Sequence, residues 1–112
     1  MQAVFSCDPE NLRSRCTLTL GENFQGWRGV VHGGVIASLL DEACIYAGRS
    51  LGETLVTAEL TVRYRKPVPV GQAVTVSGEV LERRRKVLKV KARLEIDSEL
   101  YAEADGRVFL ID

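Results

Sequence analysis

The sequence predicts an α+β domain in which an antiparallel β-sheet wraps around one long central helix. An apolar stretch without proline, from about Gly34 to Arg49, has the length and spacing of a helix. The four segments after it alternate polar and apolar residues, which is typical of strands with one solvated face. The helix and the sheet would bury their apolar faces against each other, which gives a two-layer domain.

The segment before the helix contributes one predicted strand and a loop. Up to about Arg15 the residues are mixed and unperiodic, and Asp8-Pro9 marks a turn, so we expect a loop or a short helical lead-in. Residues 16–20 alternate leucine with threonine, as expected of a strand. Three glycines between residues 21 and 29 then end the pattern and indicate a loop.

The predicted helix is apolar on nearly all of its surface. At about 100° per residue, one face carries the side chains expected to meet the sheet: Ile36, Leu39, Leu40, Ala43 and Ala47. The opposite face is still half apolar and holds Ala37, Ser38, Asp41 and Ile45. A chain of this length can hardly bury both faces by itself, so we expect the face with Asp41 to meet another subunit.

Four strands are predicted after the helix, at about residues 57–64, 73–80, 88–96 and 100–110. In the first of them, alternation places Ala58, Leu60, Val62 and Tyr64 on one face and Thr57, Glu59, Thr61 and Arg63 on the other. Turns are expected between Pro67 and Gly71, in the charged run from Glu82 to Lys86, and at Asp97-Ser98.

Length and composition limit the classes of protein that the chain can be. Its 112 residues suit one domain spanning positions 1–112. Fifteen basic and fifteen acidic residues give no net charge, which argues against a nucleic-acid partner. No apolar run is long enough to span a bilayer and the start does not resemble a secretion signal, so we expect no membrane partner and a cytoplasmic location.

The cysteine and histidine content excludes some kinds of site. Cys7, Cys16 and Cys44 are an odd number of cysteines without metal-ligand spacing, and we expect them to be reduced thiols. His32 is the only histidine, whereas a zinc site needs about four clustered ligands. We therefore expect no metal site and no cofactor.

The start of the helix is the first candidate for chemistry. Positions 32–34 read His-Gly-Gly, where Ser, Thr, Asp or Asn would usually cap the helix, so we expect the first amide groups to lack a side-chain cap. Two glycines also let a ligand approach the backbone closely. Such N–H groups at the positive end of the helix dipole would stabilise an anion or a developing oxyanion. The alternative is that the glycines only allow a tight turn.

A carboxylate within the apolar helix is the second candidate. Removing the Asp41 carboxylate from water costs several kcal/mol, so such a residue is expected to have a bonding partner or a catalytic role. Asp41 follows Gly33 by eight residues, roughly 12 Å along a helix, so both cannot act on one small group from the same helix. Two antiparallel copies could place Gly33 of one opposite Asp41 of the other. An interface ion pair of Asp41 with Arg28 or Arg49 is the alternative, and Glu42 is the second candidate carboxylate.

Two motifs resemble those of a known family. His32-Gly33-Gly34 is followed at the family spacing by Asp41, and residues 60–67 read Leu-Thr-Val-Arg-Tyr-Arg-Lys-Pro before Gly71. From about Leu18 to its end, the sequence resembles the hotdog-fold acyl-CoA thioesterases, in the branch that includes phenylacetate-degradation thioesterases and one type of 4-hydroxybenzoyl-CoA thioesterase. The resemblance implies a curved antiparallel sheet around one long central helix, in a homodimer or a homotetramer.

The resemblance also implies roles for individual residues. The Gly33 amide would polarise the thioester carbonyl, with the Gly34 amide assisting, and Asp41 of the partner subunit would act as general base on water or as nucleophile. Thr57 lies where relatives often carry a Ser or Thr that positions the water or the carboxylate; an ordinary strand threonine is the alternative. His32 would orient the loop through a hydrogen bond rather than serve as the base.

One position departs from the family pattern. Relatives often have Asn or Gln six residues before the histidine, where this chain has Gly26, so either Gln25 substitutes or the site works without the amide. Phe24 and Trp27 are candidates for the acyl pocket, with core or dimer packing as the alternative. The candidates for binding the CoA phosphates, with a solvated surface as the alternative, are Arg63, Arg65, Arg83, Arg84, Arg85 and Lys86.

The expected function is hydrolysis of a small aromatic or short-to-medium-chain acyl-CoA to the free acid and CoA. Two alternatives remain open. One is a non-catalytic module that binds or senses acyl-CoA, and the other is an enoyl-thioester hydratase, which would need a histidine paired with an acidic residue. Acyl specificity depends on the shape of a pocket at a subunit interface, which no single-chain pattern defines.

Overall fold

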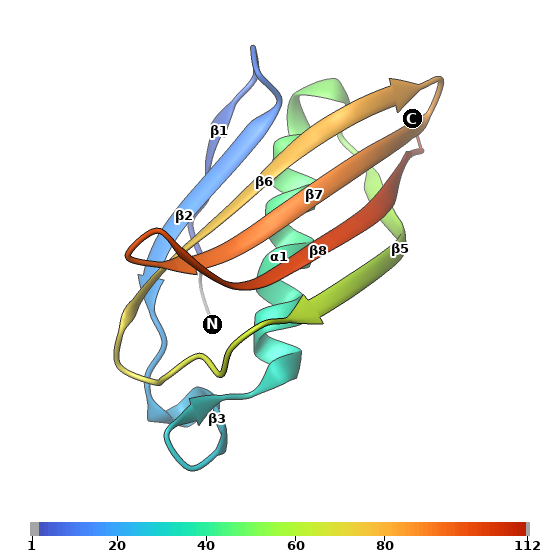
Figure 1. The fold of residues 1–112 in the computed structure, drawn as a ribbon. Coiled ribbons are helices and arrows are strands. Elements are labelled where there is room, and N and C mark those ends of the chain that lie inside the picture. Colours follow the sequence, from blue (N-terminus) through green and yellow to red (C-terminus); the bar gives the residue numbers. More distant parts are fainter. Residues whose placement is uncertain (1–2, 112) are drawn as a thin grey trace.

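A computed structural model describes residues 3–111 as a long helix packed on a six-stranded antiparallel sheet (Figure 1). The strands are β1 (Ser6–Asp8), β2 (Arg13–Thr19), β5 (Leu55–Tyr64), β6 (Ala73–Arg84), β7 (Val87–Ile96) and β8 (Glu99–Leu110), in the spatial order β1-β2-β6-β7-β8-β5. Helix α1 spans Gly33–Ala47, between a small sheet of β3 (Gln25–Trp27) and β4 (Val30–Val31) and a 3₁₀ turn at Arg49–Leu51. A second 3₁₀ turn, Glu22–Phe24, precedes β3. The predicted fold class is confirmed.

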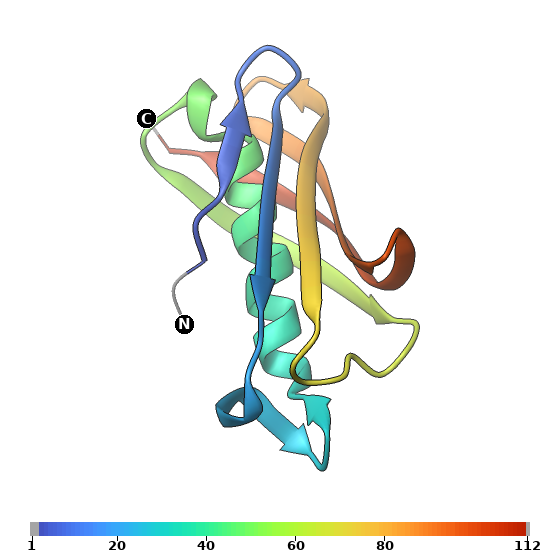
Figure 2. The same cartoon turned by 90° about the vertical axis from the view of Figure 1, so that its left-hand side faces the viewer.

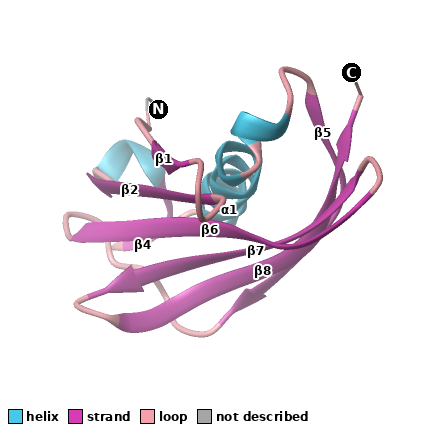
Figure 3. Ribbon diagram, turned by 90° about the horizontal axis from the view of Figure 1, so that it is seen from above, coloured by secondary structure: helices cyan, strands magenta, loops and turns pink. Residues whose placement is uncertain are grey.

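The sheet curves around α1, and the core lies between the two (Figure 3). The predicted apolar helix face is buried against the sheet, with Leu39, Leu40 and Ala43 fully inaccessible to solvent. On the opposite face, Ala37, Asp41 and Ile45 remain partly exposed and Ser38 is exposed. This chain therefore leaves the face with Asp41 incompletely covered. Within residues 3–111, no helix is long and apolar enough to cross a bilayer.

The predicted alternation is confirmed along β6, β7 and β8. Val76 pairs with Leu94, and Leu94 pairs with Ala102, so these apolar side chains form a continuous row on the side facing the helix. The predicted turn between β7 and β8 is also present. Asp97 and Ser98 both have positive φ values, 49° and 67°, as a two-residue hairpin of type I′ requires.

The N-terminal segment differs from the expected loop or helical lead-in, because it forms strand β1, which pairs with β2. Strand β2 also begins at Arg13, three residues before the predicted start. Its inward positions are Ser14 and Cys16, and Ser14 is buried because its hydroxyl donates a 2.6 Å hydrogen bond to the Ala43 carbonyl oxygen. A buried polar residue breaks the apolar alternation by which strands are predicted.

Helix α1 approaches the sheet most closely where β2 and β6 pair. Ser14 lies opposite Gly78 in the register of these strands. A Cβ atom at Gly78 would lie 2.3 Å from the Ala43 carbonyl oxygen, so only glycine permits this approach. The glycine therefore sets how closely α1 approaches the sheet at Ala43, where the hydrogen bond from Ser14 also holds it.

Strand β5 is an edge strand with a bulge. It pairs only with β8, and its other edge carries no strand in the described part of the chain. Thr57 lies opposite Val108 while Glu59 lies opposite Arg107, so Ala58 is an extra residue. The bulge places Thr57 on the helix-facing side together with Leu60. The prediction that Thr57 shares a face with Glu59 is therefore wrong.

Candidate active site

The carboxylate of Asp41 is held by a residue of the edge strand. Thr57 donates a 2.5 Å hydrogen bond from its hydroxyl to Oδ1 of Asp41, and both side chains are partly buried. No other residue among 3–111 donates a hydrogen bond to this carboxylate, so Oδ2 stays available. The pair lies where α1 faces β5, next to the uncovered edge of the sheet.

An open hollow of about 480 Å³ adjoins Asp41. Phe5 supports one wall, because its ring stacks on that of Tyr46 with centroids 5.2 Å apart. The lining residues are Ala3, Val4, Asp41, Glu42, Ile45, Tyr46 and Arg49. The hollow therefore combines apolar walls with two carboxylates, Asp41 and Glu42.

The two arginines that are the alternative interface partners of Asp41 have other surroundings within one chain. Arg49 lies over the Tyr46 ring, 5.5 Å from its centroid, and donates to the Glu53 carbonyl oxygen at 3.0 Å. Neither Arg28 nor Arg49 forms an ion pair with Asp41 in the part of the chain that the structure describes.

The start of α1 is capped by a side chain, so the expectation of an uncapped helix is wrong. Nδ1 of His32 accepts a 2.8 Å hydrogen bond from the Gly34 amide. The amides of Val35 and Ile36 donate to the His32 carbonyl oxygen. The Gly34 amide is thereby engaged within the loop. The Gly33 amide has no hydrogen-bond partner among residues 3–111 and is the donor open to a ligand.

A second hollow, of about 390 Å³, lies beside Gly33. Its walls include Val31, Ile36 and Val68, together with Tyr64 from the end of β5. The Tyr64 hydroxyl donates a 2.8 Å hydrogen bond to the Gly33 carbonyl oxygen. Sequence reasoning placed Tyr64 on the helix-facing side of the strand without assigning it a role. The sequence feature that could have indicated a role for Tyr64 is its phenol at the end of an otherwise apolar strand face.

The two halves of the site are far apart in one chain. Gly33 and Asp41 are the first and the ninth residue of the continuous helix α1. At about 1.5 Å per residue they are separated by roughly 12 Å. A single copy therefore cannot apply the Gly33 amide and the Asp41 carboxylate to the same small group.

The loop before α1 explains the glycine at position 26. A Cβ atom there would lie 2.9 Å from Cα of His32, so Gly26 lets the loop pack against the capping residue. Oε1 of Gln25 accepts a 2.7 Å hydrogen bond from the Gly29 amide and holds the β3–β4 turn. This oxygen is thus already engaged, and the Gln25 side chain serves the loop.

The two aromatic candidates have different surroundings. Phe24 is half-buried and packs against the core. Trp27 is 81% exposed and belongs to the β3–β4 hairpin, which projects beyond the start of α1 (Figure 2). Trp27 is therefore available for contact with a ligand or another subunit, whereas Phe24 supports the loop from within.

Three of the six candidate cations, Arg63, Arg65 and Arg84, are engaged in ion pairs. Arg63 pairs with Asp105 at 2.5 Å and Arg84 with Glu82 at 2.8 Å. Arg65 binds Glu103, and Nε of Arg83 donates to the Arg85 carbonyl oxygen. The β6–β7 tip lies at the same end of the molecule as the C-terminal end of α1, opposite the end at which α1 begins with Gly33 (Figure 1). The side chains of Arg85 and Lys86, at this tip, have no ion-pair partner among the described residues.

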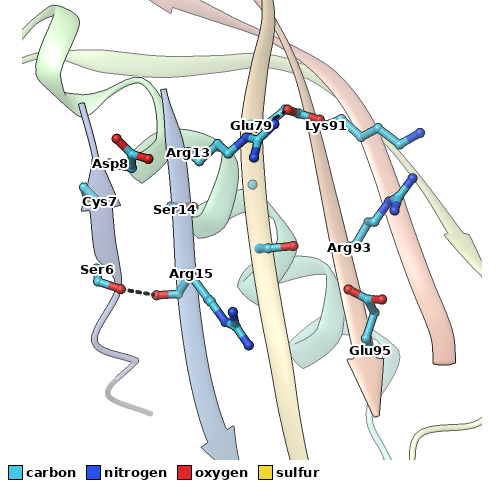
Figure 4. A pocket seen from close by; sticks show the side chains of 12 residues that line it. Ser6, Cys7, Asp8, Arg13, Ser14, Arg15, Glu79, Lys91, Arg93 and Glu95 are labelled. Carbon is cyan, nitrogen blue, oxygen red and sulfur yellow. Dashed lines mark hydrogen bonds and ion pairs between the residues drawn. The ribbon is translucent and has the colours of Figure 1, made fainter. Parts of the chain in front are cut away.

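A further hollow of about 510 Å³ lies over β2, β6 and β7 (Figure 4). Its rim mixes both charges, including the ion pair of Arg13 with Glu79 and the side chains of Lys91, Arg93 and Glu95. Neither Asp41 nor Gly33 lines it. This charged surface is separate from the candidate active site.

The cysteine nearest to Asp41 in the chain is not a plausible nucleophile. Burial, followed by the charge of Asp41, raises the pKa of the Cys44 thiol to about 12. Such a thiol stays protonated at neutral pH and lies within the core. Within residues 3–111, no three His, Cys, Asp or Glu side chains are arranged to hold a metal ion.

Comparison with known proteins identifies the family. Residues 28–102 match the thioesterase superfamily, and the chain belongs to it. The acyl-coenzyme A thioesterase THEM4 of Bos taurus is 31% identical over 102 residues, which are 89% of this chain and 42% of that protein. The chain thus spans less than half the length of this relative.

Solved structures share the fold. A phenylacetic acid degradation-related protein of Ralstonia eutropha JMP134 superposes with a TM-score of 0.87 at 21% identity, covering 96% of this chain and 84% of the other. A protein of Streptococcus mutans UA159, solved with bound acetyl CoA, gives 0.88 at 20% identity and covers 97% and 88% of the two chains. At these identities the likeness shows the hotdog fold alone.

Proposed function

We propose that this chain is a thioesterase domain, spanning residues 1–112, that hydrolyses acyl-CoA to a free acid and CoA. The observation that carries the proposal is the Asp41 carboxylate, held at Oδ1 by Thr57 and open at Oδ2, beside a hollow between α1 and the segment before β1. Membership of the thioesterase superfamily and the name of the bovine relative support the same reaction.

The active unit in this proposal is a dimer. A long edge strand with unpaired backbone groups favours pairing with another strand, and β5 has such an edge within residues 3–111. An antiparallel second copy would pair there and cover the helix face with Asp41. It would also place Gly33 of one copy opposite Asp41 of the other, which removes the separation found in one chain. Pairing of two dimers into a tetramer remains part of the proposal.

In the proposed mechanism, each active site uses one residue from each of the two copies. The Gly33 amide donates to the thioester carbonyl oxygen and stabilises the charge that develops there. Asp41 of the partner subunit takes a proton from water, whose oxygen attacks the carbonyl carbon. The C–S bond then breaks, and the CoA thiolate receives the proton. In the alternative nucleophilic mechanism, Oδ2 attacks the carbonyl carbon, the C–S bond breaks and the CoA thiolate leaves, which forms a mixed anhydride. Water then hydrolyses the anhydride to the free acid and the Asp41 carboxylate, and a proton from this water neutralises the thiolate.

The size of the hollow beside Asp41 supports a small acyl group, and the cations of the β6–β7 tip support a site for the CoA phosphates. About 480 Å³ beside Asp41, with Val4, Ile45 and Tyr46 among the lining residues, suits a small aromatic or short-to-medium acyl chain. In the antiparallel dimer the hairpin tip of one copy would approach the helix start of the other. Arg85 and Lys86 are then the cations proposed for the CoA phosphates.

The test is thiol release from a panel of aromatic and aliphatic acyl-CoA thioesters. We expect turnover of at least one substrate and a loss of at least about 100-fold in Asp41→Asn, because the general base is removed. Glu42→Gln is the matched control, since it neutralises the neighbouring carboxylate in the same hollow. Full activity of Asp41→Asn, with the oligomer intact by light scattering, would refute the assignment.

A binding module is the second candidate, because no side-chain amide oxygen is offered at positions 25 and 26. Gly26 has no side chain, and Oε1 of Gln25 is engaged by Gly29. Ligand-induced thermal stabilisation without turnover of any thioester would favour this function. A hydratase has less support, since His32 caps the helix and has no carboxylate partner among residues 3–111.

A further inference from the structure

The peptide group between Gly33 and Gly34 is held at both of its polar atoms. Its carbonyl oxygen accepts a 2.8 Å hydrogen bond from the Tyr64 hydroxyl. Its N–H group donates a 2.8 Å hydrogen bond to Nδ1 of His32. Rotation of this peptide plane would therefore weaken two hydrogen bonds, one from β5 and one from the capping loop.

This peptide needs an external constraint. Two consecutive glycines have unusually wide backbone freedom, so the helix start could adopt several orientations at small cost. The adjacent peptide carries the Gly33 N–H group, which is the donor proposed for the thioester carbonyl. An oxyanion donor contributes most when its direction is set before the reaction. The Gly33 N–H group shares its peptide with the His32 carbonyl, which accepts from the Val35 and Ile36 amides. The hydrogen bond from Tyr64 to the next peptide limits the φ and ψ of Gly33, and so narrows the freedom that this N–H group still has.

We propose that Tyr64 is a positioning residue that orients the Gly33 amide for the carbonyl oxygen of the substrate, an inference that rests on the proposed thioesterase function. The location of Tyr64 suits this role. It ends β5 opposite the small residue Ala102, and its hydroxyl would lie 3.4 Å from a Cβ atom at Gly33. The ring is 53% exposed, so the hydroxyl is held by its hydrogen bond rather than by dense packing.

The first test removes only the hydroxyl. Tyr64→Phe should lower kcat about three- to tenfold, the effect of one lost hydrogen bond, and change KM less than twofold. Tyr101→Phe is the matched control, because it removes a phenolic hydroxyl that contacts Glu99 instead; we expect both parameters to stay within twofold of the wild type. Unchanged kcat in Tyr64→Phe, or a rise in KM alone, would overturn the proposal.

A double-mutant cycle tests whether Tyr64 and His32 act on the same peptide. The losses in kcat for Tyr64→Phe and His32→Ala should be non-additive, since either change releases the peptide. Strictly additive losses would contradict a shared constraint.

Amide exchange separates this inference from the proposed function. The Gly34 N–H group should exchange with solvent several-fold faster in Tyr64→Phe than in wild type. Unchanged exchange, in an active wild type, removes the role of Tyr64 alone. Absence of thiol release from the wild type removes the thioesterase function, and with it any catalytic role for Tyr64.

Discussion

Thr57 donates a hydrogen bond to Asp41 across the gap between the edge strand and the central helix, at 2.5 Å. The contact depends on the bulge at Ala58, which places Thr57 on the helix-facing side of β5. With Oδ1 engaged, the rotation of the carboxylate is restricted, and Oδ2 has a defined direction. A local backbone irregularity thus orients the carboxylate of Asp41, the proposed general base.

Replacing Thr57 should lower activity without unfolding the protein. Thr57→Val keeps the shape and loses the hydroxyl, so we expect kcat to fall about tenfold as the carboxylate loses one charge-assisted hydrogen bond. Thr57→Ser should recover most of the rate. Thr61→Val, on the outer face of the same strand, is the control and should leave kcat unchanged. Equal rates for Thr57→Val and wild type would show that the hydrogen bond has no catalytic role.

The β5 edge predicts the register of the dimer. If Gly33 faces Asp41 of the partner subunit, the two-fold axis crosses α1 near Ala37, midway between them. On β5 the matching contacts are Tyr64 and Thr57, whose midpoint lies between Leu60 and Thr61. Because a two-fold axis between identical antiparallel strands lies at a residue that faces its own copy, we place it at Thr61. Helix and strand therefore place the axis at the same level.

Disulfide trapping can check this register. In a Cys7→Ser background, which removes the exposed native thiol, Thr61→Cys should form an intermolecular disulfide under mild oxidation, since facing residues of paired strands lie within bonding range. Thr17→Cys, on β2 away from this edge, is the control and should remain reduced. Equal cross-linking at both positions, measured on non-reducing gels, would refute pairing through β5.

The close packing of Gly26 on His32 predicts a cost for the smallest possible side chain. In Gly26→Ala, the new Cβ would lie 2.9 Å from Cα of His32, so the cap must shift, and we expect a loss of roughly 1–3 kcal/mol in unfolding free energy. Gly21→Ala is the control, because its Cβ would meet only Oδ1 of Asn23, at 3.3 Å. Urea denaturation measures both variants. Equal stability of the two would contradict the packing described for Gly26.

The ion pair of Glu103 with Arg65 predicts a dependence of stability on pH. The two hydrogen bonds from Arg65, at 2.9 and 2.7 Å, hold the pKa of the Glu103 carboxyl below its ordinary value of 4.5, against the opposing effect of burial. A carboxyl with a lowered folded-state pKa stabilises the fold above pH 4.5 and loses this contribution as the pH falls through the folded value.

The variant Glu103→Gln isolates that contribution. It should be less stable than wild type by on the order of 0.5–1 kcal/mol at pH 7, and the difference should shrink between about pH 5 and pH 3. Glu53→Gln, an exposed carboxylate outside the ion pairs of residues 3–111, should show no such pH-dependent difference. Thermal unfolding across this pH range gives the comparison. A difference that stays constant with pH would exclude the ion pair as its cause.

Much of the fold could be predicted from the sequence because its patterns are regular. Alternation along β6 to β8 and the apolar face of α1 follow directly from side-chain periodicity. The candidates Gly33, Asp41 and Thr57 were found from the glycines, the isolated carboxylate and the family resemblance. The pairing of Thr57 with Asp41 could not be seen, since period-2 alternation cannot anticipate the bulge at Ala58.

Other features depend on contacts that no local pattern encodes. Ser14 is buried only because the Ala43 carbonyl lies beside it, so β2 was predicted too short. His32 is an uncommon capping residue, and its role depends on the rotamer that brings Nδ1 to the Gly34 amide. The hydroxyl of Tyr64 reaches Gly33 across 31 residues of sequence. The contacts of Ser14 and Tyr64 are tertiary, whereas the cap by His32 is local but depends on a side-chain conformation that the sequence pattern does not specify.

The close approach of α1 to Gly78 limits how the candidate site can be altered by substitution. Ser14 and Gly78 lie on β2 and β6, away from β5, yet through Ala43 they set how closely the helix lies against the sheet. Asp41 is only two residues before Ala43, so an added methyl group at Gly78 would shift the carboxylate relative to Thr57. Substitutions intended to widen the proposed acyl pocket should therefore leave this contact unchanged, because the position of Asp41 relative to Thr57 depends on it.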